Sequence, residues 1–278
     1  MSKHADIDVR MKHNYEEVYK FRLTRRTPVA IRLDGKAFHT FTKYFFKPFD
    51  DLMRESMNET MKYLCENIQG CVFGYTQSDE ITLILIDYEN LTSDAWFDYE
   101  VQKLCSISAS MATFRFNRVF NHFVAIEQSE MIENKPEYQA HVLACDRGAM
   151  FDARCFNIPK EEVCNLIFSR QIDCIRNAIQ MIGRANFSHT ELDEKTVEDI
   201  KRMLKDEKNI DWQTYENKYI RGVACKRVGI TSENPIFSEE VPYITDTKER
   251  SKFVLDYNIP IFKGENRAYI EDLIFVGD

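Results

Sequence analysis

The chain has 278 residues and a formal net charge of −8, and 44% of its residues are hydrophobic. This content is enough to bury a core, so the composition excludes a disordered chain, and nine glycines and seven prolines are too few for collagen-like or low-complexity sequences. The acidic balance argues against a general basic nucleic-acid binder, although net charge says nothing about local basic patches. We expect one large domain, or one domain with an appendage.

The N-terminus and the cysteines give no sign of secretion. Residues 1–22 are charged throughout and lack the apolar core of a signal peptide, and no stretch approaches the ~18 uncharged apolar residues of a membrane span. The eight cysteines never form a Cys-x-x-Cys pair, which favours reduced core thiols over a zinc site. We therefore expect a soluble, cytoplasmic protein without a membrane partner.

The first third of the chain predicts a helix, a strand, a helix and a hairpin. Residues 7–26 are charged with interspersed apolar positions, and an apolar run over 28–38 closes with Asp34-Gly35, which indicates a strand followed by a turn. Over 49–68 the apolar residues recur near the 3.6-residue helical period. Two β-rich arms within 70–89 flank Ser78-Asp79-Glu80, which predicts a hairpin.

The rest of the chain continues the alternation of helices and strands. The patterns predict helices over 98–123 and 161–183, strands over 149–157 and 218–230, and a capped short helix from Thr196 to Leu204. After residue 229 there are ten acidic residues against five basic ones, so most of the acidic excess is C-terminal.

The order β–α–β–β–α–β over 28–157 is the ferredoxin-like pattern, which is also the arrangement of a polymerase palm. We predict an α+β fold, a ferredoxin-like polymerase-palm antiparallel sheet with helices packed on it. The expected division is a palm-like catalytic domain over 1–228, which ends in helical elements, and a C-terminal extension over 229–278 whose role the sequence leaves open.

Two carboxylates are the strongest candidates for chemistry. Asp34 ends the first strand and Asp79 lies in the hairpin, so in a ferredoxin-like sheet both converge at one sheet end. Two such carboxylates suit a pair of Mg²⁺ ions, and Gly35 leaves its carbonyl open to a metal. Residues 36–39 could direct backbone N–H groups at a triphosphate. Against this, a lone Asp-Gly usually marks only a turn, and Ser-Asp-Glu usually forms a solvated loop.

Other polar residues carry weaker signals. Lys43 and Lys47 follow the first strand in an aromatic-rich loop, where they could equally cover core aromatics. Arg170, Asp173 and Asn177 share one helix face, by default a solvated one. The residues from 218 to 228 form a basic stretch suited to phosphates. His39 and His189 are isolated, so we expect no metal role for either.

The motifs together resemble a known family. Arg32-Leu33-Asp34-Gly35-Lys36-Ala37-Phe38-His39, then Lys47-Pro48, then Tyr75-Thr76-Gln77-Ser78-Asp79-Glu80 resemble the tRNA-histidine guanylyltransferase superfamily, the 3′–5′ nucleotide-adding polymerases. Phe151-Asp152-Ala153-Arg154, Arg170-Gln171-Ile172-Asp173-Cys174 and Tyr219-Ile220-Arg221-Gly222 resemble later blocks of the same family, in order. The resemblance spans roughly residues 25–228.

The resemblance implies a nucleotidyltransferase and a role for each site residue. Asp34, the Gly35 carbonyl and Asp79 would hold two Mg²⁺ ions, with Glu80 beside them as the third catalytic carboxylate. ATP, GTP or another nucleoside triphosphate would contact Asp34, Gly35, Lys36, Ala37, Phe38, His39, Lys47, Ser78 and Asp79. The partner would be tRNA, bound by Lys103, Arg154, Arg170, Asn177 and Arg221, and the enzyme would be a homotetramer.

The family also implies a reaction sequence. ATP activates the 5′-monophosphate of a tRNA, the 3′-hydroxyl of an incoming nucleotide attacks the adenylylated end, and pyrophosphate is finally removed. Members that add the extra guanosine to histidine tRNA carry a His-Ile-Asn-Asn block, where this chain has Ile175-Arg176-Asn177-Ala178. Lys103 is kept, but Glu100 stands where a basic residue is common.

These departures favour the guanylyltransferase-like branch, which repairs truncated tRNA 5′ ends by templated addition. The alternatives are the histidine-tRNA guanylyltransferase itself, a non-catalytic RNA-binding module and a nucleotide cyclase. An RNA-binding module would need stacking aromatics on its central strands, and the strands here lack that pattern.

Overall fold

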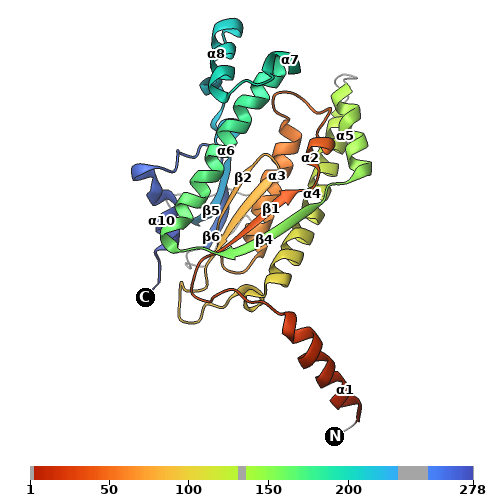
Figure 1. Ribbon diagram of the computed structural model, residues 1–278, viewed down its shortest axis with the longest axis vertical. Coiled ribbons are helices and arrows are strands. Elements are labelled where there is room, and N and C mark those ends of the chain that lie inside the picture. Colours follow the sequence, from red (N-terminus) through yellow and green to blue (C-terminus); the bar gives the residue numbers. More distant parts are fainter. Residues whose placement is uncertain (1–2, 131–135, 231–249, 278) are drawn as a thin grey trace.

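The fold is built on a six-stranded antiparallel sheet in the order β4-β1-β3-β2-β5-β6 (Figure 1). The computed structural model describes residues 3–130, 136–230 and 250–277. The strands are β1 (Val29–Gly35), β2 (Cys71–Gln77), β3 (Glu80–Leu85), β4 (Phe151–Asn157), β5 (Val223–Ile230) and β6 (Arg250–Asp256).

Four strands and two long helices form the ferredoxin-like unit. Helix α3 (Asp51–Asn67) connects β1 to β2, and α4 (Val101–Glu130) connects β3 to β4. The spatial order β4-β1-β3-β2 follows the ferredoxin-like pattern, and α3 packs against α4 over one face of the sheet. The predicted α+β class with a ferredoxin-like antiparallel sheet is therefore confirmed.

The period-2 alternation of β1 decides which residues reach each face of the sheet. Val29, Ile31 and Leu33 are fully buried in the core beneath α3 and α4, whereas Ala30 belongs to the core on the opposite face. Helices α6 (Lys160–Asn186) and α10 (Ala268–Ile274) cover that opposite face (Figure 1). By the same alternation Asp34 lies on the side of the sheet that carries α6.

A helical arm extends from the end of α6 away from the sheet (Figure 1). It contains α7 (His189–Leu192) and α8 (Val197–Lys208), which pack on the last turns of α6 through a small core of their own. The predicted capping box at the start of α8 is present, because the Thr196 side chain accepts from the Asp199 backbone and Asp199 accepts in return. Helix α9 (Asn217–Ile220) then leads into β5.

Several boundaries differ from the prediction. The expected helix over 7–26 is α1 (Lys3–Met11) followed by a π-helix over Lys12–Glu16 and a 3₁₀ turn over Glu17–Tyr19. The chain then leaves the helix because Phe21, Arg22 and Leu23 pair with the segment at the start of α4 instead. Helix α4 runs on to Glu130, and the predicted strand over 218–230 begins only after α9.

Several elements were not predicted, and the longest of them are α5 (Pro136–Arg147), β6 and α10. Helix α5 precedes β4, and β6 and α10 lie in the acidic C-terminal segment. The expected boundary between residues 228 and 229 falls within β5, and β6 pairs with β5 along its whole length. Six acidic residues of that segment, Glu233, Glu239, Glu240, Asp246, Glu249 and Asp278, lie outside the described residues. Among the helices that are described, none has the length and apolar character needed to cross a membrane.

The C-terminal packing predicts a stability effect. Ile270 is fully buried against the α6 side of the sheet, so Ile270→Ala should lower the free energy of unfolding by about 2–5 kcal/mol through lost burial and a cavity. Denaturant unfolding measures this. Phe275→Ala, at a side chain that is 52% exposed, is the matched control and should change stability by less than about 0.5 kcal/mol. Equal effects of the two changes would contradict the packing of α10.

Candidate active site

The paired carboxylates lie at one end of the sheet. Asp34 ends β1 opposite Glu80 in the β1–β3 register, and the next residue, Gly35, donates its backbone N–H to the carbonyl of Asp79 at 3.0 Å. Ser78, which has a left-handed backbone with φ of 51°, turns the hairpin so that Asp79 follows directly. The structure thus brings together Asp34 and Asp79, which lie 45 positions apart in the sequence.

Both carboxylates are electrostatically strained as anions. Burial raises the pKa of Asp34, and the carboxylate of Asp152, directly across the β1–β4 pairing, raises it further. Burial also raises the pKa of Asp79. The Ser78 hydroxyl at 3.0 Å from Asp79 opposes this rise, while the charge of Asp34 adds to it. A cation between the two carboxylates would remove the strain.

The donor set at this end fits Mg²⁺. The described residues hold no preassembled group of three or more His, Cys, Asp or Glu side chains, so the chain offers two carboxylates and the Gly35 carbonyl. Mg²⁺ commonly binds through one or two carboxylates and completes its octahedron with waters and substrate phosphates. A site of this kind therefore needs no third acidic side chain.

Glu80 is paired with helix α6 through its carboxylate. Its carboxylate accepts from Arg170 on α6 at 3.2 Å and from the Thr82 hydroxyl at 3.4 Å, and Arg170 also pairs with Asp173 at 2.6 Å. Burial raises the pKa of Glu80, and the Arg170 charge opposes that rise. Glu80 therefore anchors α6 beside the two aspartates.

The turn after β1 separates exposed residues from a buried anchor. Lys36 and His39 are exposed, and Ala37 has the left-handed conformation (φ 57°) that starts the short helix α2 (Phe38–Phe41). Phe38 is only 3% exposed and packs against Phe116 and Phe151, so its ring is part of the core. The Phe38 ring also occupies the place of a Gly35 side chain, because a Cβ there would lie 2.3 Å from it. Phe38 can meet a ligand only through its backbone.

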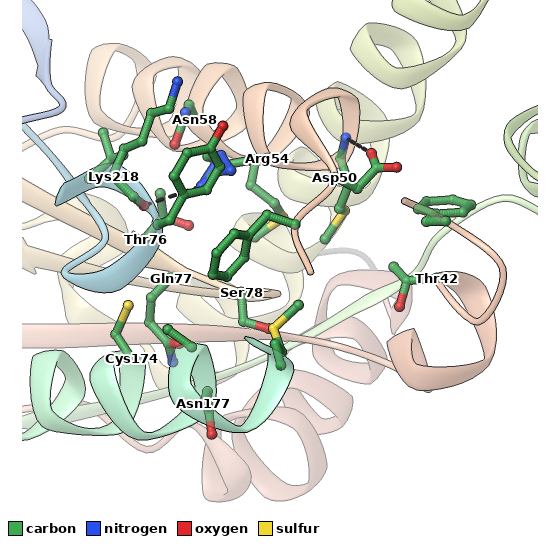
Figure 2. Close-up of a pocket in the computed structure, with 18 of the residues that line it drawn as sticks. Thr42, Asp50, Arg54, Asn58, Thr76, Gln77, Ser78, Cys174, Asn177 and Lys218 are labelled. Atoms are coloured by element: carbon green, nitrogen blue, oxygen red, sulfur yellow. Dashed lines mark hydrogen bonds between the residues drawn. The ribbon is translucent and has the colours of Figure 1, made fainter. Parts of the chain in front are cut away.

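A pocket opens beside the hairpin, between α3 and α6 (Figure 2). Its volume is about 120 Å³, several times the roughly 10–15 Å³ that one water needs. The wall from Thr42 to Asp50 includes Phe45, Phe46 and Lys47, and Ser78 joins the pocket to the carboxylate pair. The remaining lining comes from α3, α6, the end of β2, and Lys218, Tyr219 and Val223.

Two buried polar atoms of the pocket lining have no partner among the described residues. They are the Nε of Arg54 and the Oδ1 of Asn58, one helical turn apart on α3. The Arg54 guanidinium stacks 3.7 Å from the Tyr219 ring, whose hydroxyl donates to Asp51 at 2.7 Å. A donor and an acceptor within an apolar, aromatic wall complement a flat ring with polar edges.

The residues predicted to bind tRNA do not form one cluster. Arg154 lies near Asp34 and pairs with Asp152, and Asn177 lines the pocket from α6. Arg221 is committed to the C-terminal segment, since it donates to the Ile259 carbonyl at 3.4 Å. Lys103 lies in the first turn of α4. Residues 113–117, further along that helix, contact the end of the sheet where Asp34 lies, so Lys103 is at the opposite end of the sheet.

The inner lining of the pocket was not predicted from the sequence. Arg54 and Asn58 are polar residues on the apolar face of α3, a signal that could have singled them out. Asp50 carried only the signal of a helix cap, and it does cap α3 by accepting from the Met53 backbone at 2.8 Å. His141 carried no signal, because α5 was not predicted.

Comparisons with known proteins agree with the motifs. A family model described as tRNAHis guanylyltransferase matches residues 9–159. An uncharacterized protein of Acanthamoeba polyphaga mimivirus is 30% identical over 272 residues, which cover 94% of this chain and 89% of that protein. The tRNA(His) guanylyltransferase of Schizosaccharomyces pombe is 25% identical over 197 residues, which cover 66% of this chain and 67% of that protein.

Solved structures of tRNA(His) guanylyltransferase-like proteins are also similar to this chain. A bacterial tRNA(His) guanylyltransferase-like protein in complex with ATP matches with a TM-score of 0.78 and 34% identity, over 98% of this chain and 100% of that chain. A structure of such a protein with GTP matches with a TM-score of 0.70 and 31% identity, over 97% and 100%. The Saccharomyces cerevisiae enzyme, at a TM-score of 0.58 and 20% identity over 83% and 97%, shares the fold.

The family match spans more than half of the chain and includes both carboxylate motifs, Asp34-Gly35 and Ser78-Asp79-Glu80. The chain belongs to the tRNAHis guanylyltransferase family, a family of nucleotidyltransferases.

Proposed function

We propose that this chain is a Mg²⁺-dependent enzyme that adds nucleotides in the 3′–5′ direction to tRNA 5′ ends, directed by the opposite strand as template. The observation that carries the proposal is the pair Asp34 and Asp79 at one sheet end, joined through Ser78 to a pocket of suitable shape for a base. The ATP and GTP complexes of similar bacterial proteins support nucleoside triphosphates as substrates.

Each element of the site has a role in this proposal. The base of the nucleotide enters the pocket between α3 and α6, and its triphosphate extends past Ser78 and Lys47 toward Asp34 and Asp79. At the same end of the sheet, Lys36 supplies positive charge and the backbone of the turn before α2 supplies N–H donors. When bound there, Mg²⁺ neutralises phosphate charge and aligns the attacking and leaving oxygens. Arg154, whose charge acts on Asp34, and Arg170, which pairs with the adjacent Glu80, would meet the tRNA 5′ phosphate.

Two observations favour 5′-end repair over guanosine addition to histidine tRNA. The His-Ile-Asn-Asn block of the guanosine-adding enzymes is replaced by Ile175-Arg176-Asn177-Ala178, and Arg176 pairs with Asp173 at 2.9 Å. The chain is also more similar to the guanylyltransferase-like structures than to the Saccharomyces cerevisiae enzyme. Addition of the extra 5′ guanosine is the second candidate.

We carry the homotetramer forward as part of the proposal. The apolar side chains of Tyr15, Val18, Tyr19 and Phe21, beyond α1, are each more than half exposed in the single chain. A subunit contact would cover such a surface.

The repair reaction predicts a substrate preference. With ATP, nucleoside triphosphates and Mg²⁺, a 5′-monophosphorylated tRNA that lacks its first nucleotides should be lengthened according to the opposite strand. Gel analysis of labelled tRNA measures this. An intact histidine tRNA is the comparison: efficient guanosine addition to it, without templated repair of the truncated tRNA, would assign the chain to the second candidate. No reaction with either substrate would favour an RNA-binding module.

The carboxylate pair predicts a loss of activity without a loss of fold. Asp34→Asn or Asp79→Asn should lower the rate of nucleotide transfer by at least about 100-fold, because one anionic oxygen ligand is removed where charge is stabilised. The melting temperature of the metal-free protein should not fall, since each change relieves repulsion within the site. Asp146→Asn, at an exposed carboxylate on α5, is the control. Transfer that survives both site changes would remove the two-metal assignment.

The pocket predicts opposite effects on stability and nucleotide binding. Asn58→Leu replaces a buried acceptor that lacks a partner, so the free protein should be about as stable as before or more stable. ATP affinity should fall roughly tenfold, because the base loses a polar partner. Thermal melting and calorimetric titration with ATP measure the two effects. Asn67→Leu, at an exposed position of α3, should leave ATP binding unaltered. Unchanged ATP affinity in Asn58→Leu would place the base elsewhere.

A further inference from the structure

His141 is a fully buried side chain that bridges two carboxylates. Its Nε2 lies 2.8 Å from the Asp50 Oδ2 and its Nδ1 lies 2.9 Å from the Glu127 Oε2. A neutral imidazole donates from only one ring nitrogen, so the doubly protonated imidazolium is the form that donates to both carboxylates. His141 thus joins α5, which carries it, to the start of α3 and to α4.

Asp50 is the point where this bridge meets the pocket. Its Oδ1 accepts from the Met53 backbone and caps α3, and its Oδ2 accepts from the Phe46 backbone at 3.1 Å as well as from His141. Asp50 therefore holds the second half of the 42–50 wall, from Phe46 to the start of α3, and Lys47 lies within that half. Figure 2 shows Asp50 at the rim of the pocket, with Thr42 across the same loop.

The surroundings of His141 are otherwise apolar. Rings of Phe45, Phe46 and Phe120 lie 4.6, 5.8 and 6.1 Å from the imidazole, and Tyr138 on α5 lies 6.4 Å away. Among the described residues, Asp50 and Glu127 are the charged groups that face it, and Tyr138 is the remaining titratable one. Glu127 does not line the pocket, and its side chain is 24% exposed.

We propose that His141 is a positioning residue for nucleotide binding: as an imidazolium between Asp50 and Glu127, it holds the 42–50 wall of the pocket in its binding conformation. The inference rests on the proposed function, because it concerns the pocket assigned to the base and Lys47. His141 does not itself line the pocket; it acts through its contact with Asp50 and through the Phe45 and Phe46 rings that pack against it.

The charge of His141 makes this role sensitive to pH. Burial lowers the pKa of His141, but the hydrogen bonds and charges of Asp50 and Glu127 outweigh it, so the pKa lies above the ordinary value of about 6.5. The support is complete below that ordinary value and is lost as the pH rises through the raised pKa. Above it, one imidazole nitrogen presents a lone pair to a carboxylate and the wall loosens.

The test is ATP affinity, measured by calorimetric titration with Mg²⁺ present, from about pH 6 to about pH 9. In the wild-type protein we expect affinity to fall roughly tenfold at the alkaline end, as a charge-assisted hydrogen bond is lost. His141→Gln should bind ATP weakly throughout, without the alkaline fall. Its KM for ATP should rise, while kcat changes by less than about threefold, because the carboxylate pair is untouched.

A second variant keeps the test decisive if His141→Gln does not fold. Glu127→Gln leaves Asp50 and His141 in place but removes one anion, so the alkaline fall should move to lower pH. His122→Gln, at an exposed histidine on α4, is the matched control and should keep the wild-type profile. Ionisation of ATP itself is common to all variants and cancels in the comparison.

The outcomes separate the inference from the function beneath it. ATP binding with the same pH profile in wild type, His141→Gln and Glu127→Gln would overturn the positioning role and leave the proposed function intact. Failure of the wild-type protein to bind ATP at any of these pH values would overturn the proposed function and the inference with it. A shifted profile in Glu127→Gln alone supports the role, since that side chain reaches the pocket only through His141.

Discussion

The antiparallel pairing of β1 with β3 is the constraint on which the rest of the site depends. It places Asp34 opposite Glu80 and lets the Gly35 N–H donate to the Asp79 carbonyl. The carboxylates of Asp34 and Asp79 therefore meet at one end of the sheet. A register shift of one residue would move Asp34 to the face beneath α3 and α4, among Ile31 and Leu33. The chemistry thus depends on a pairing that the buried residues of β1 enforce from the other face.

The two aspartates and the 42–50 wall of the pocket are held in place in different ways. The two aspartates lie on strands, where ladder hydrogen bonds fix the backbone, whereas the 42–50 wall is a loop tied down through Asp50, His141 and the aromatic cluster around Phe45. In the proposed function, nucleotide binding would therefore respond to changes in the wall while the two aspartates stay in place. Such a division allows affinity and catalytic rate to be altered separately.

Charge is distributed unevenly along the chain, and this makes a net acidic chain compatible with the phosphate-rich substrate proposed above. The net charge of −8 includes Asp34, Asp79 and Glu80, of which the first two suit a metal and the third pairs with Arg170. Near the same edge Arg154 and Arg170 are committed to Asp152, Asp173 and Glu80 rather than free. For the tRNA substrate proposed above, attraction at this site would be local and would depend on a bound cation, so we expect it to be weakened by salt.

The order of the core elements, the α+β class and the two aspartates could be predicted from local patterns, because helical and strand periodicity and turn residues act over a few neighbouring positions. The pocket, the pairing of Glu80 with Arg170, and the bridge from Asp50 to His141, which are 91 residues apart, follow from tertiary packing instead. These features depend on how α3 and α6 pack on the sheet and on how α5 packs against α4. Strand β6 was also not predicted, because it lies in a charged segment. A strand at the edge of a sheet depends more on pairing with its neighbour, here β5, than on its own residue pattern.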